Sequence, residues 1–269
     1  MKKFAFRLVL LFLIAVVIVG LNSQLTLTGY RISNSRIPES FDGYRIALVS
    51  DLHAERFGDK QQDLIGLLRE SECDLICFSG DMVSHDTADF SPVWELIDGL
   101  TGIPMVYVAG NNELSMKDYG WFLSELDIRG VTVLDDMART VLPVDKGQDR
   151  ILIHGYPFTD SRRLSGRLPV AEKGFYNILL YHDPYCFPEA AELDYDLMLA
   201  GHIHGGVVRL PLVGSPLEWL RLEPYTKGLY TTRAAALVLS GGLGPHETLP
   251  RFFNAPEVVL ITLVTPGNS

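Results

Sequence analysis

Seven side chains of the kind that bind metal ions follow short apolar runs along the sequence. They are Asp51, His53, Asp81, Asn111, His182, His202 and His204. Imidazole nitrogens combined with carboxylate and amide oxygens favour manganese, iron or zinc over calcium. Seven such ligands exceed what one zinc ion usually takes, so the pattern predicts two divalent ions that share a carboxylate. A pair of ions can clamp the attacking and leaving oxygens of an in-line displacement, as in phosphoester cleavage.

Each motif taken alone has an ordinary structural explanation. Gly-Asp and Gly-Asn-Asn usually mark turns, and a single histidine such as His182 can lie in a core. The segment GHIHGG, residues 201–206, is harder to explain, because two histidines and three glycines around one isoleucine make a poor core strand. An extended His-x-His would point its rings to opposite faces, whereas a turn at Gly205 and Gly206 would let them address two ions. The joint pattern therefore favours a metal centre.

The apolar runs before these ligands indicate strands that end in loops. Strand-and-loop segments are expected over residues 45–53, 74–81, 104–113, 131–134, 151–156, 176–184, 196–206, 235–244 and 258–264, and helices over 60–71, 91–100 and 118–129. Strands alternating with helices, followed by mostly strands, predict an α/β fold of two packed mixed sheets with helices outside. Loops at strand ends can be aimed from a rigid sheet, which suits ligands. Gly80 and Gly110 would allow unusual backbone angles and close approach beside Asp81 and Asn111.

The N-terminal segment predicts a membrane anchor. Lys2, Lys3 and Arg7 precede or interrupt an apolar run that extends to Leu21. We expect an uncleaved single-pass transmembrane helix over residues 1–22, a stalk and entry segment over 23–42, and one catalytic domain over 43–269. Basic residues stay cytoplasmic, which would place the domain outside the cell membrane. A cleaved signal peptide and a buried core helix are the alternatives.

Composition limits the partners. The net charge of −10 opposes long-range attraction to nucleic acid, so no nucleic-acid partner is expected. The chain is also expected to be a monomer. The three cysteines, Cys73, Cys77 and Cys186, fit no disulfide framework and are expected to be buried apolar residues.

The order of DLH, GD, GNN, YHDP and GHIHGG resembles that of the calcineurin-like metallophosphoesterases, and the resemblance runs from about Tyr44 to the end. The ending LSGGLGPHETLPRFFNAPEVVLITL resembles the membrane-anchored bacterial branch. This resemblance implies a four-layer α/β/β/α sandwich and a metal-bridging hydroxide that attacks phosphorus. It also implies the ligand sets, Asp51, His53, Asp81 and His204 for the first ion and Asp81, Asn111, His182 and His202 for the second.

The sequence departs from the family at two linked positions. The usual GNH is GNN here, with Asn112 in place of histidine, and the last residue of the usual GDxxD is Ser84. These two family residues normally form the acid dyad, and Asn112, Glu113 and His85, besides Asp81, are the remaining catalytic candidates. Since a general acid matters least for a stable leaving group, we expect a phosphodiester or diphosphate substrate. A phosphomonoesterase and a metal-binding pseudoenzyme are the alternatives.

The segment after GHIHGG offers a possible lipid contact. Leu217, Trp219 and Leu220 are expected to pack in the core, the alternative being an exposed apolar lip that selects a lipid-linked substrate over a soluble phosphorylated small molecule. Four basic residues are candidate phosphate contacts, and two further histidines lie outside the ligand set. These are Arg209, Arg221, Lys227 and Arg251, with His154 expected to be structural and His246 to line the cleft.

Overall fold

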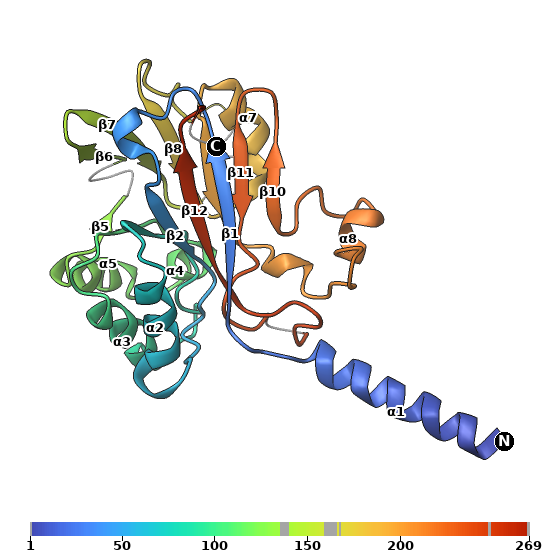
Figure 1. The fold of residues 1–269 in the computed structure, drawn as a ribbon. Coiled ribbons are helices and arrows are strands. Elements are labelled where there is room, and N and C mark those ends of the chain that lie inside the picture. The colour runs from blue at the N-terminus through green and yellow to red at the C-terminus, as the bar shows by residue number, and fades with distance from the viewer. Residues whose placement is uncertain (1, 135–139, 159–165, 167, 247–248, 268–269) are drawn as a thin grey trace.

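The computed structural model describes residues 2–134, 140–158, 166, 168–246 and 249–267. Within these residues the strands form two six-stranded sheets that pack face to face (Figure 1). Both sheets mix parallel and antiparallel neighbours, as expected from the sequence.

The first sheet carries most of the N-terminal half of the chain and the last strand. In spatial order its strands are β1 (Thr26–Ser33), β12 (Glu257–Val264), β2 (Arg45–Val49), β3 (Leu75–Phe78), β4 (Met105–Tyr107) and β5 (Thr132–Val133). Strands β2 to β5 run parallel, and β12 runs antiparallel to β2. The central strands are buried along their whole length, which explains why they read as continuous apolar runs.

The second sheet is built from the C-terminal half. In spatial order its strands are β10 (Gly228–Thr231), β11 (Ala236–Leu239), β9 (Leu197–Ala200), β8 (Tyr176–Leu180), β7 (Asp149–Gly155) and β6 (Val141–Lys146). The four inner strands are parallel, and an antiparallel strand closes each edge.

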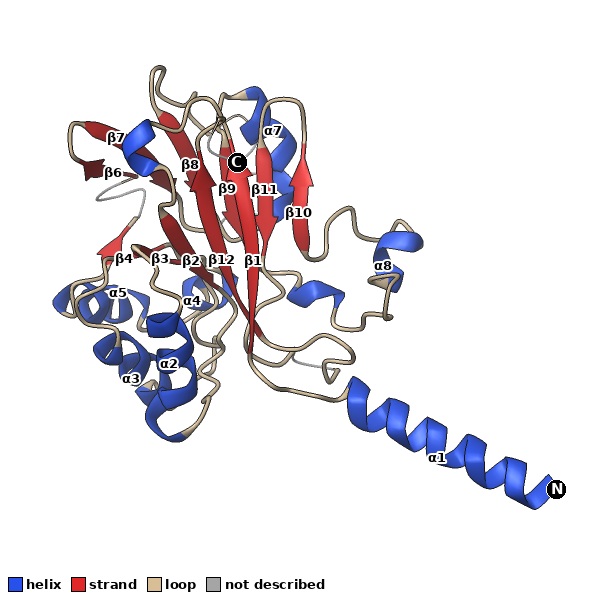
Figure 2. Cartoon of the chain, in the orientation of Figure 1, coloured by secondary structure: helices blue, strands red, loops and turns tan. Residues whose placement is uncertain are grey.

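Helices cover the outer faces of the two sheets (Figure 2). The helices are α1 (Lys2–Gly20), α2 (Gln62–Glu70), α3 (Ser91–Gly99), α4 (Asn111–Leu114), α5 (Tyr119–Ile128), α7 (Phe187–Glu192) and α8 (Pro216–Trp219). Helices α2, α3 and α5 pack on the first sheet and α7 packs on the second. In α2 the buried residues Leu64 and Leu68 lie four apart, one turn along a single face. The expected helices over 60–71, 91–100 and 118–129 therefore correspond to α2, α3 and α5.

The space between the sheets is filled by side chains from both of them. Leu48, Cys77 and Val106 from the first sheet meet Ile178 and Leu199 from the second. Cys77 is fully buried there, and Cys73 and Cys186 are buried too, with all three free. This inter-sheet core fixes the sheets relative to each other and so fixes the strand ends that carry the ligands.

The first sheet begins earlier in the chain than expected. Residues 23–42 were expected to form a stalk outside the domain, but Thr26–Ser33 is strand β1 and pairs with β12 over eight residues. Ile32 is buried in the inter-sheet core. The segment after α1 is therefore part of the sheet.

Helix α1 projects from the body of the molecule (Figure 1). Its described side chains from Phe4 to Val19 are mostly exposed although nearly all are apolar. Within the described residues, no helix has both the length and the apolar character needed to cross a membrane, so the expected transmembrane helix is not confirmed.

The segment around α8 does not pack as expected. Trp219 and Leu220 were expected in the core, but they are 46% and 66% exposed, and only Leu217 is partly buried. Leu212 and Leu222, on either side of α8, are exposed as well. An apolar surface therefore surrounds this short helix.

Candidate metal centre

The seven predicted ligands lie in the segments that directly follow five strands, with Asn111 at the start of α4. Asp51 and His53 follow β2, Asp81 follows β3, Asn111 follows β4, His182 follows β8, and His202 and His204 follow β9. Because β2, β3 and β4 are parallel, and β8 and β9 are parallel, these loops leave each sheet at one end. The inter-sheet core holds the two ends together, and the structure brings ligands from both sheets into contact.

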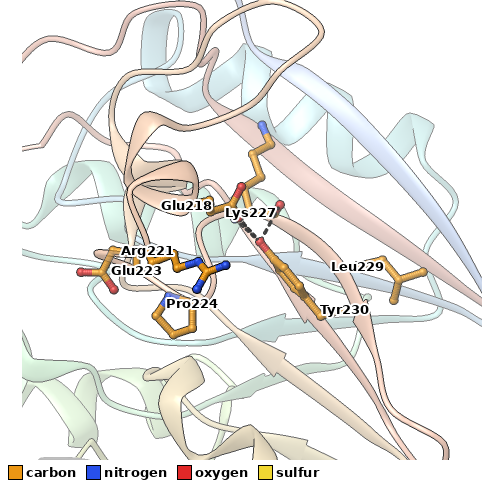
Figure 3. A pocket seen from close by; sticks show the side chains of 7 residues that line it. All are labelled: Glu218, Arg221, Glu223, Pro224, Lys227, Leu229 and Tyr230. Carbon is orange, nitrogen blue, oxygen red and sulfur yellow. Dashed lines mark hydrogen bonds between the residues drawn. The ribbon is translucent and has the colours of Figure 1, made fainter.

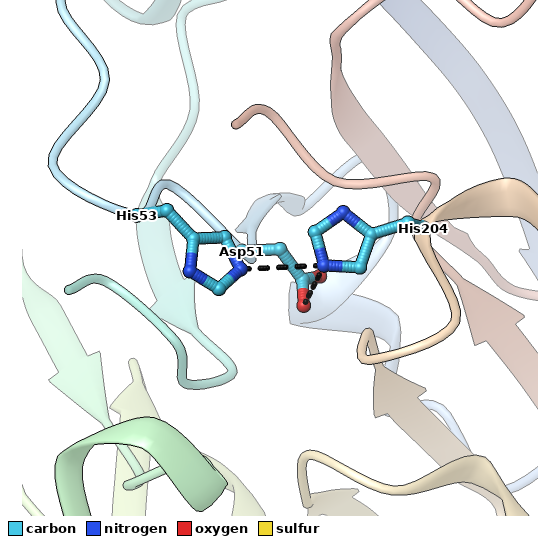
Figure 4. A group of neighbouring side chains, drawn as sticks. All are labelled: Asp51, His53 and His204. Carbon is cyan, nitrogen blue, oxygen red and sulfur yellow. Dashed lines mark hydrogen bonds and ion pairs between the residues drawn. The ribbon is translucent and has the colours of Figure 1, made fainter. Parts of the chain in front are cut away.

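The first group joins Asp51, His53 and His204 (Figure 4), with one potential ligand atom of each within 4.8 Å of the others. Nε2 of His53 and Nε2 of His204 are 3.2 Å apart. Nε2 of His204 is 3.6 Å from Oδ1 of Asp51. Two nitrogens bound to one zinc-like ion are about 3–3.4 Å apart, so this spacing suits a shared cation.

The second group joins Asp81, His182 and His202 under the same limit. Nε2 of His182 is 3.3 Å from Oδ2 of Asp81 and 3.1 Å from Nδ1 of His202. The other nitrogen of His182, Nδ1, is 2.7 Å from the carbonyl oxygen of Ser79. A ring that donates Nδ1–H to this carbonyl presents its Nε2 lone pair to the group, as metal-binding histidines do.

The two groups adjoin. Oδ2 of Asp81 is 4.0 Å from Nε2 of His53, and Oδ1 of Asp51 is 4.0 Å from Nε2 of His182. The carboxylates and His182 are buried, whereas His53 and His202 are partly exposed. The cluster is therefore a single centre that meets solvent on the side of these two histidines.

His202 and His204 fall into different groups. The chain turns as the sequence analysis anticipated, with Gly205 and Gly206 at φ of 63° and 71°. Strand β9 ends at Ala200, and His202 itself has a φ of 79°, so the pair is not in extended backbone. The turn therefore lets one His-x-His segment supply a histidine to each of the two groups.

Two glycines allow neighbouring loops to touch. Gly80 has a φ of 97°, and a Cβ there would lie 2.4 Å from the backbone nitrogen of Gly110. A Cβ on Gly110 would lie 2.2 Å from Oδ1 of Asp81. Both positions require glycine for close approach, as expected, and only Gly80 also requires a left-handed backbone.

Burial keeps two of the candidate ligand histidines neutral, whereas neighbouring carboxylates raise the pKa of a third. Burial lowers the pKa of His202 and that of His204 to about 4, so both rings keep a free lone pair near pH 7. For His182, burial would lower the pKa, but the carboxylates of Asp81 and Asp51 outweigh it and raise the pKa to about 10. A cation bound among these carboxylates would supply the same compensation, and His182 would bind it as neutral imidazole.

The donor set fits a pair of divalent ions. Oδ1 of Asn111 is buried and has no hydrogen-bond partner within the described residues, which is costly unless a cation takes the lone pair. Four imidazole rings have a spacing suited to shared ions, and two carboxylates supply negative charge. The residues could hold two ions of manganese, iron or zinc.

Groups outside the ligand set orient it, and the sequence analysis did not identify them in this role. Oγ of Ser84 is 3.1 Å from Nδ1 of His53. Nδ2 of Asn254 donates to the carbonyl of His204 over 2.8 Å. Nη2 of Arg251 is 3.3 Å from Nδ1 of His204. Ser84, at the position where the family has the acidic member of the dyad, thus contacts His53.

The catalytic candidates differ in where they lie. Both amide ends of Asn112 are engaged, because Nδ2 donates to Oδ2 of Asp81 over 2.6 Å and Oδ1 accepts from the backbone of His85 over 3.2 Å. Glu113 is fully buried and accepts from the backbone N–H groups of Asp81, Met82 and Gly110. These contacts tie the β3 and β4 loops together through Glu113, and its role as a catalytic candidate stays a prediction. His85 is exposed.

The remaining candidates are distributed over the molecule. Lys227 pairs with the buried Glu257 over 2.8 Å, and with Arg221 it lines a cavity of about 580 Å³ beside β10 (Figure 3). Arg209 donates to the carbonyl of Gly205 over 3.0 Å. Two histidines complete the set: His154 is buried and bonded to Asn177 over 2.9 Å, and the ring of His246 is 5.4 Å from that of His204.

Carboxylate and imidazole ligands on the strand ends of a double-sheet sandwich define a metallophosphoesterase. The family model described as calcineurin-like phosphoesterase matches residues 44–206, and the chain belongs to this family. That range contains all seven predicted ligands.

Curated relatives cover most of the chain. A *Bacillus subtilis* protein called "Uncharacterized metallophosphoesterase YkuE" is 29% identical over 88% of this chain and 84% of its own length. "Phosphodiesterase YaeI" from *Escherichia coli* is 29% identical over 82% of each chain. Among solved structures, the Thermus thermophilus sulfate thiohydrolase SoxB is 14% identical over 77% of this chain and 52% of its own, with a TM-score of 0.47.

Proposed function

We propose that this chain hydrolyses a phosphodiester or diphosphate bond at a centre of two divalent ions. The observation that carries the proposal is the position of Asp81, whose Oδ2 lies 3.3 Å from His182 in one group and 4.0 Å from His53 in the other. Asp81 would bridge the ions, with Asp51, His53 and His204 on the first and Asn111, His182 and His202 on the second. Bound ions would supply an activated nucleophile and stabilise charge on the phosphoryl oxygens.

The lack of a histidine general acid at position 112 limits the leaving groups that this site can expel. Asn112 carries an amide where the family has histidine, and its amide is already bonded to Asp81 and His85. A positioned general acid typically contributes about 10²–10⁴ in rate, chiefly for basic leaving groups. A phosphate or an activated alcohol leaves as a stable anion, so a diphosphate or activated diester suits this site better than an alkyl monoester.

We also propose that α1 holds the chain at the cell membrane, with the catalytic domain on the extracytoplasmic side. The described apolar side chains of α1 are exposed, and an apolar patch of this size is stable when lipid covers it. Lys2, Lys3 and Arg7 would remain cytoplasmic. In Figure 1, α1 and the exposed apolar segment around α8 project toward the same side of the view. A membrane anchor would hold the site close to any substrate that has a lipid part.

The test uses the full chain loaded with Mn²⁺ in detergent. Two ions per chain are expected by elemental analysis, together with faster cleavage of bis(p-nitrophenyl) phosphate than of p-nitrophenyl phosphate. Asp81→Asn should reduce the metal content to one ion or fewer and the diesterase rate at least a hundredfold. Asp86→Asn, an exposed acid in the same loop, is the matched control and should keep both.

Each other outcome has a distinct meaning. Faster monoester cleavage would replace the proposal with phosphomonoesterase activity. A chain that holds both ions but cleaves no phosphoester would contradict hydrolysis while leaving the metal centre intact.

A further inference from the structure

A second cavity, of about 660 Å³, lies between the end of α1 and the metal centre. Its walls come from three segments of the chain. They are residues 21–25 after α1, residues 55–58 with Asp63 and Leu67 of α2, and Leu243, Pro245, Pro250, Arg251 and Pro256 before β12. Half of the sixteen described residues that line it are leucine, phenylalanine or proline. A cavity of this size falls in the range of small-molecule sites, and its apolar half lies beside polar and charged groups such as Glu55, Arg56 and Asp63.

One end of this cavity meets the metal centre. Arg251 lines the cavity, and its Nη2 is 3.3 Å from Nδ1 of His204. The guanidinium is fixed in that place, because Nε donates to the carbonyl of Gly244 over 2.8 Å and Nη1 donates to that of Gly241 over 2.7 Å. A fixed guanidinium beside a ligand histidine suits a phosphoryl oxygen.

The opposite wall of the cavity belongs to the segment that leaves α1. Leu21 and Leu25 line it, and Leu21 follows directly on α1. Gly20 packs on the same C-terminal segment, since its carbonyl accepts from the backbone of Phe253 over 2.6 Å. The segment that leaves α1 therefore forms one wall of the cavity, with Leu21 and Leu25 as its apolar residues and Asn22, Ser23 and Gln24 between them.

We propose that this cavity binds the aliphatic chain of a lipid-like phosphoester and places the phosphoryl group beside Arg251 at the metal centre. The inference rests on the proposed phosphoester hydrolysis and adds the substrate class. A chain drawn from the membrane around α1 would pass along Leu21 and Leu25 toward Leu67 on α2. Each methylene buried in this way favours binding about fourfold.

The experiment compares two soluble chromogenic diesters, methyl and octyl p-nitrophenyl phosphate, with the full chain in nanodiscs. The octyl ester is expected to have a kcat/KM at least tenfold higher than the methyl ester. Leu67→Trp fills the cavity from α2 and should lower this octyl-to-methyl ratio at least fivefold. Leu229→Trp is the matched control, because Leu229 is 39% exposed and lines the separate cavity beside β10, and it should leave the ratio unchanged.

Partition of the octyl ester into the bilayer is the same for all variants, so only the cavity can make the variants differ. Equal kcat/KM for the two esters in the unaltered chain, or the same ratio in Leu67→Trp as in the control, would overturn the inference and leave the proposed hydrolysis standing. Absence of cleavage of either ester by the metal-loaded chain would instead count against the hydrolysis itself. Melting temperatures within a few degrees of the unaltered chain establish that both variants fold.

Discussion

Five of the seven proposed ligands have backbone angles that side chains rarely adopt. Asp51, His53, Asp81, His202 and His204 have φ between 48° and 79°. Such residues cost about 1–3 kcal/mol each and persist when their surroundings impose them. The strain is concentrated where the ions would bind, so the loops are shaped for the ligands at the expense of stability.

Metal removal should therefore lower the melting temperature. A ligand present at about 100 times its Kd contributes about 2.7 kcal/mol, and a domain of this size shifts by about 2–4 °C for each kcal/mol. We expect EDTA to lower the melting temperature by about 5–10 °C and Mn²⁺ or Zn²⁺ to restore it. Scanning calorimetry measures both steps. An Asp81→Asn chain that responds to metal as strongly as the unaltered one would contradict the proposed bridge.

Ser84 gives a second residue-scale prediction. Its hydroxyl is 3.1 Å from Nδ1 of His53 and can hold that ring with Nε2 toward the metal. Loss of such an orienting group typically costs about 10–100-fold in metal affinity. Ser84→Ala should weaken binding of one of the two ions by this factor in a calorimetric titration. Ser124→Ala, which removes an exposed hydroxyl on α5, should have no effect; an equal loss in both would indicate a non-specific cause.

The sequence predicted a set of candidate ligands but not the groups that contact and orient them. Asp81 and His204 stood out as members of a joint pattern, in which seven residues of metal-binding type follow apolar strands. Ser84 was recognised only as a departure from the family, since nothing in a sequence shows that its hydroxyl would face His53. The same holds for Arg251, which lies 47 residues after His204 yet contacts it. When common polar residues make contacts across long sequence separations, the neighbouring sequence carries no pattern that predicts those contacts.

At the scale of elements, the close contact between the β3 and β4 loops should be measurable. Gly80 and Gly102 share a φ of 97°, but a Cβ on Gly80 would meet Gly110 whereas one on Gly102 would meet open space. Gly102→Ala should cost only the backbone term, about 1–2 kcal/mol. Gly80→Ala should cost about 1–3 kcal/mol more, from overpacking.

Thermal unfolding of the two variants isolates the loop contact. Because overpacking adds to the loss of stability in Gly80→Ala, we expect this variant to melt roughly 2–12 °C below Gly102→Ala. Because the two positions share the backbone strain, equal melting temperatures would mean that the β3 and β4 loops separate easily and do not hold Asp81 in place.

Long apolar runs made the central strands predictable, whereas three of the edge strands, β1, β6 and β10, were not expected from the sequence. Strands β2, β3, β4, β8 and β9 are buried nearly throughout, so composition alone indicated them. Strand β1 alternates exposed and partly buried residues along TLTGYRIS, a weak pattern. Its stability comes from β12, more than 200 residues away, and short-range periodicity cannot show such a partner.

At the scale of the whole molecule, the two ends of the chain complete one sheet. Strand β1 pairs with β12 over eight residues, and Thr28 donates to Glu257 over 2.5 Å across that pair. Without β1, the buried strand β12 would become an unprotected edge, which promotes aggregation. The chain must therefore be nearly complete before the first sheet can close, and α1 is attached to the body through this closing strand.

Truncation separates the role of α1 from that of β1. A chain starting at Ser23 lacks α1 and keeps β1, whereas one starting at Asn34 lacks both but retains the hydrogen bond from Asn34 to Asp196. The first should fold, bind two metal ions and fail to co-sediment with lipid vesicles that retain the full chain. The second loses the burial of Ile32 and part of Tyr30, at least about 3 kcal/mol, so it should melt at least about 6 °C lower or aggregate. Equal melting temperatures for the two truncated chains would show that β1 is dispensable, and vesicle binding by the chain starting at Ser23 would show that α1 is not the anchor.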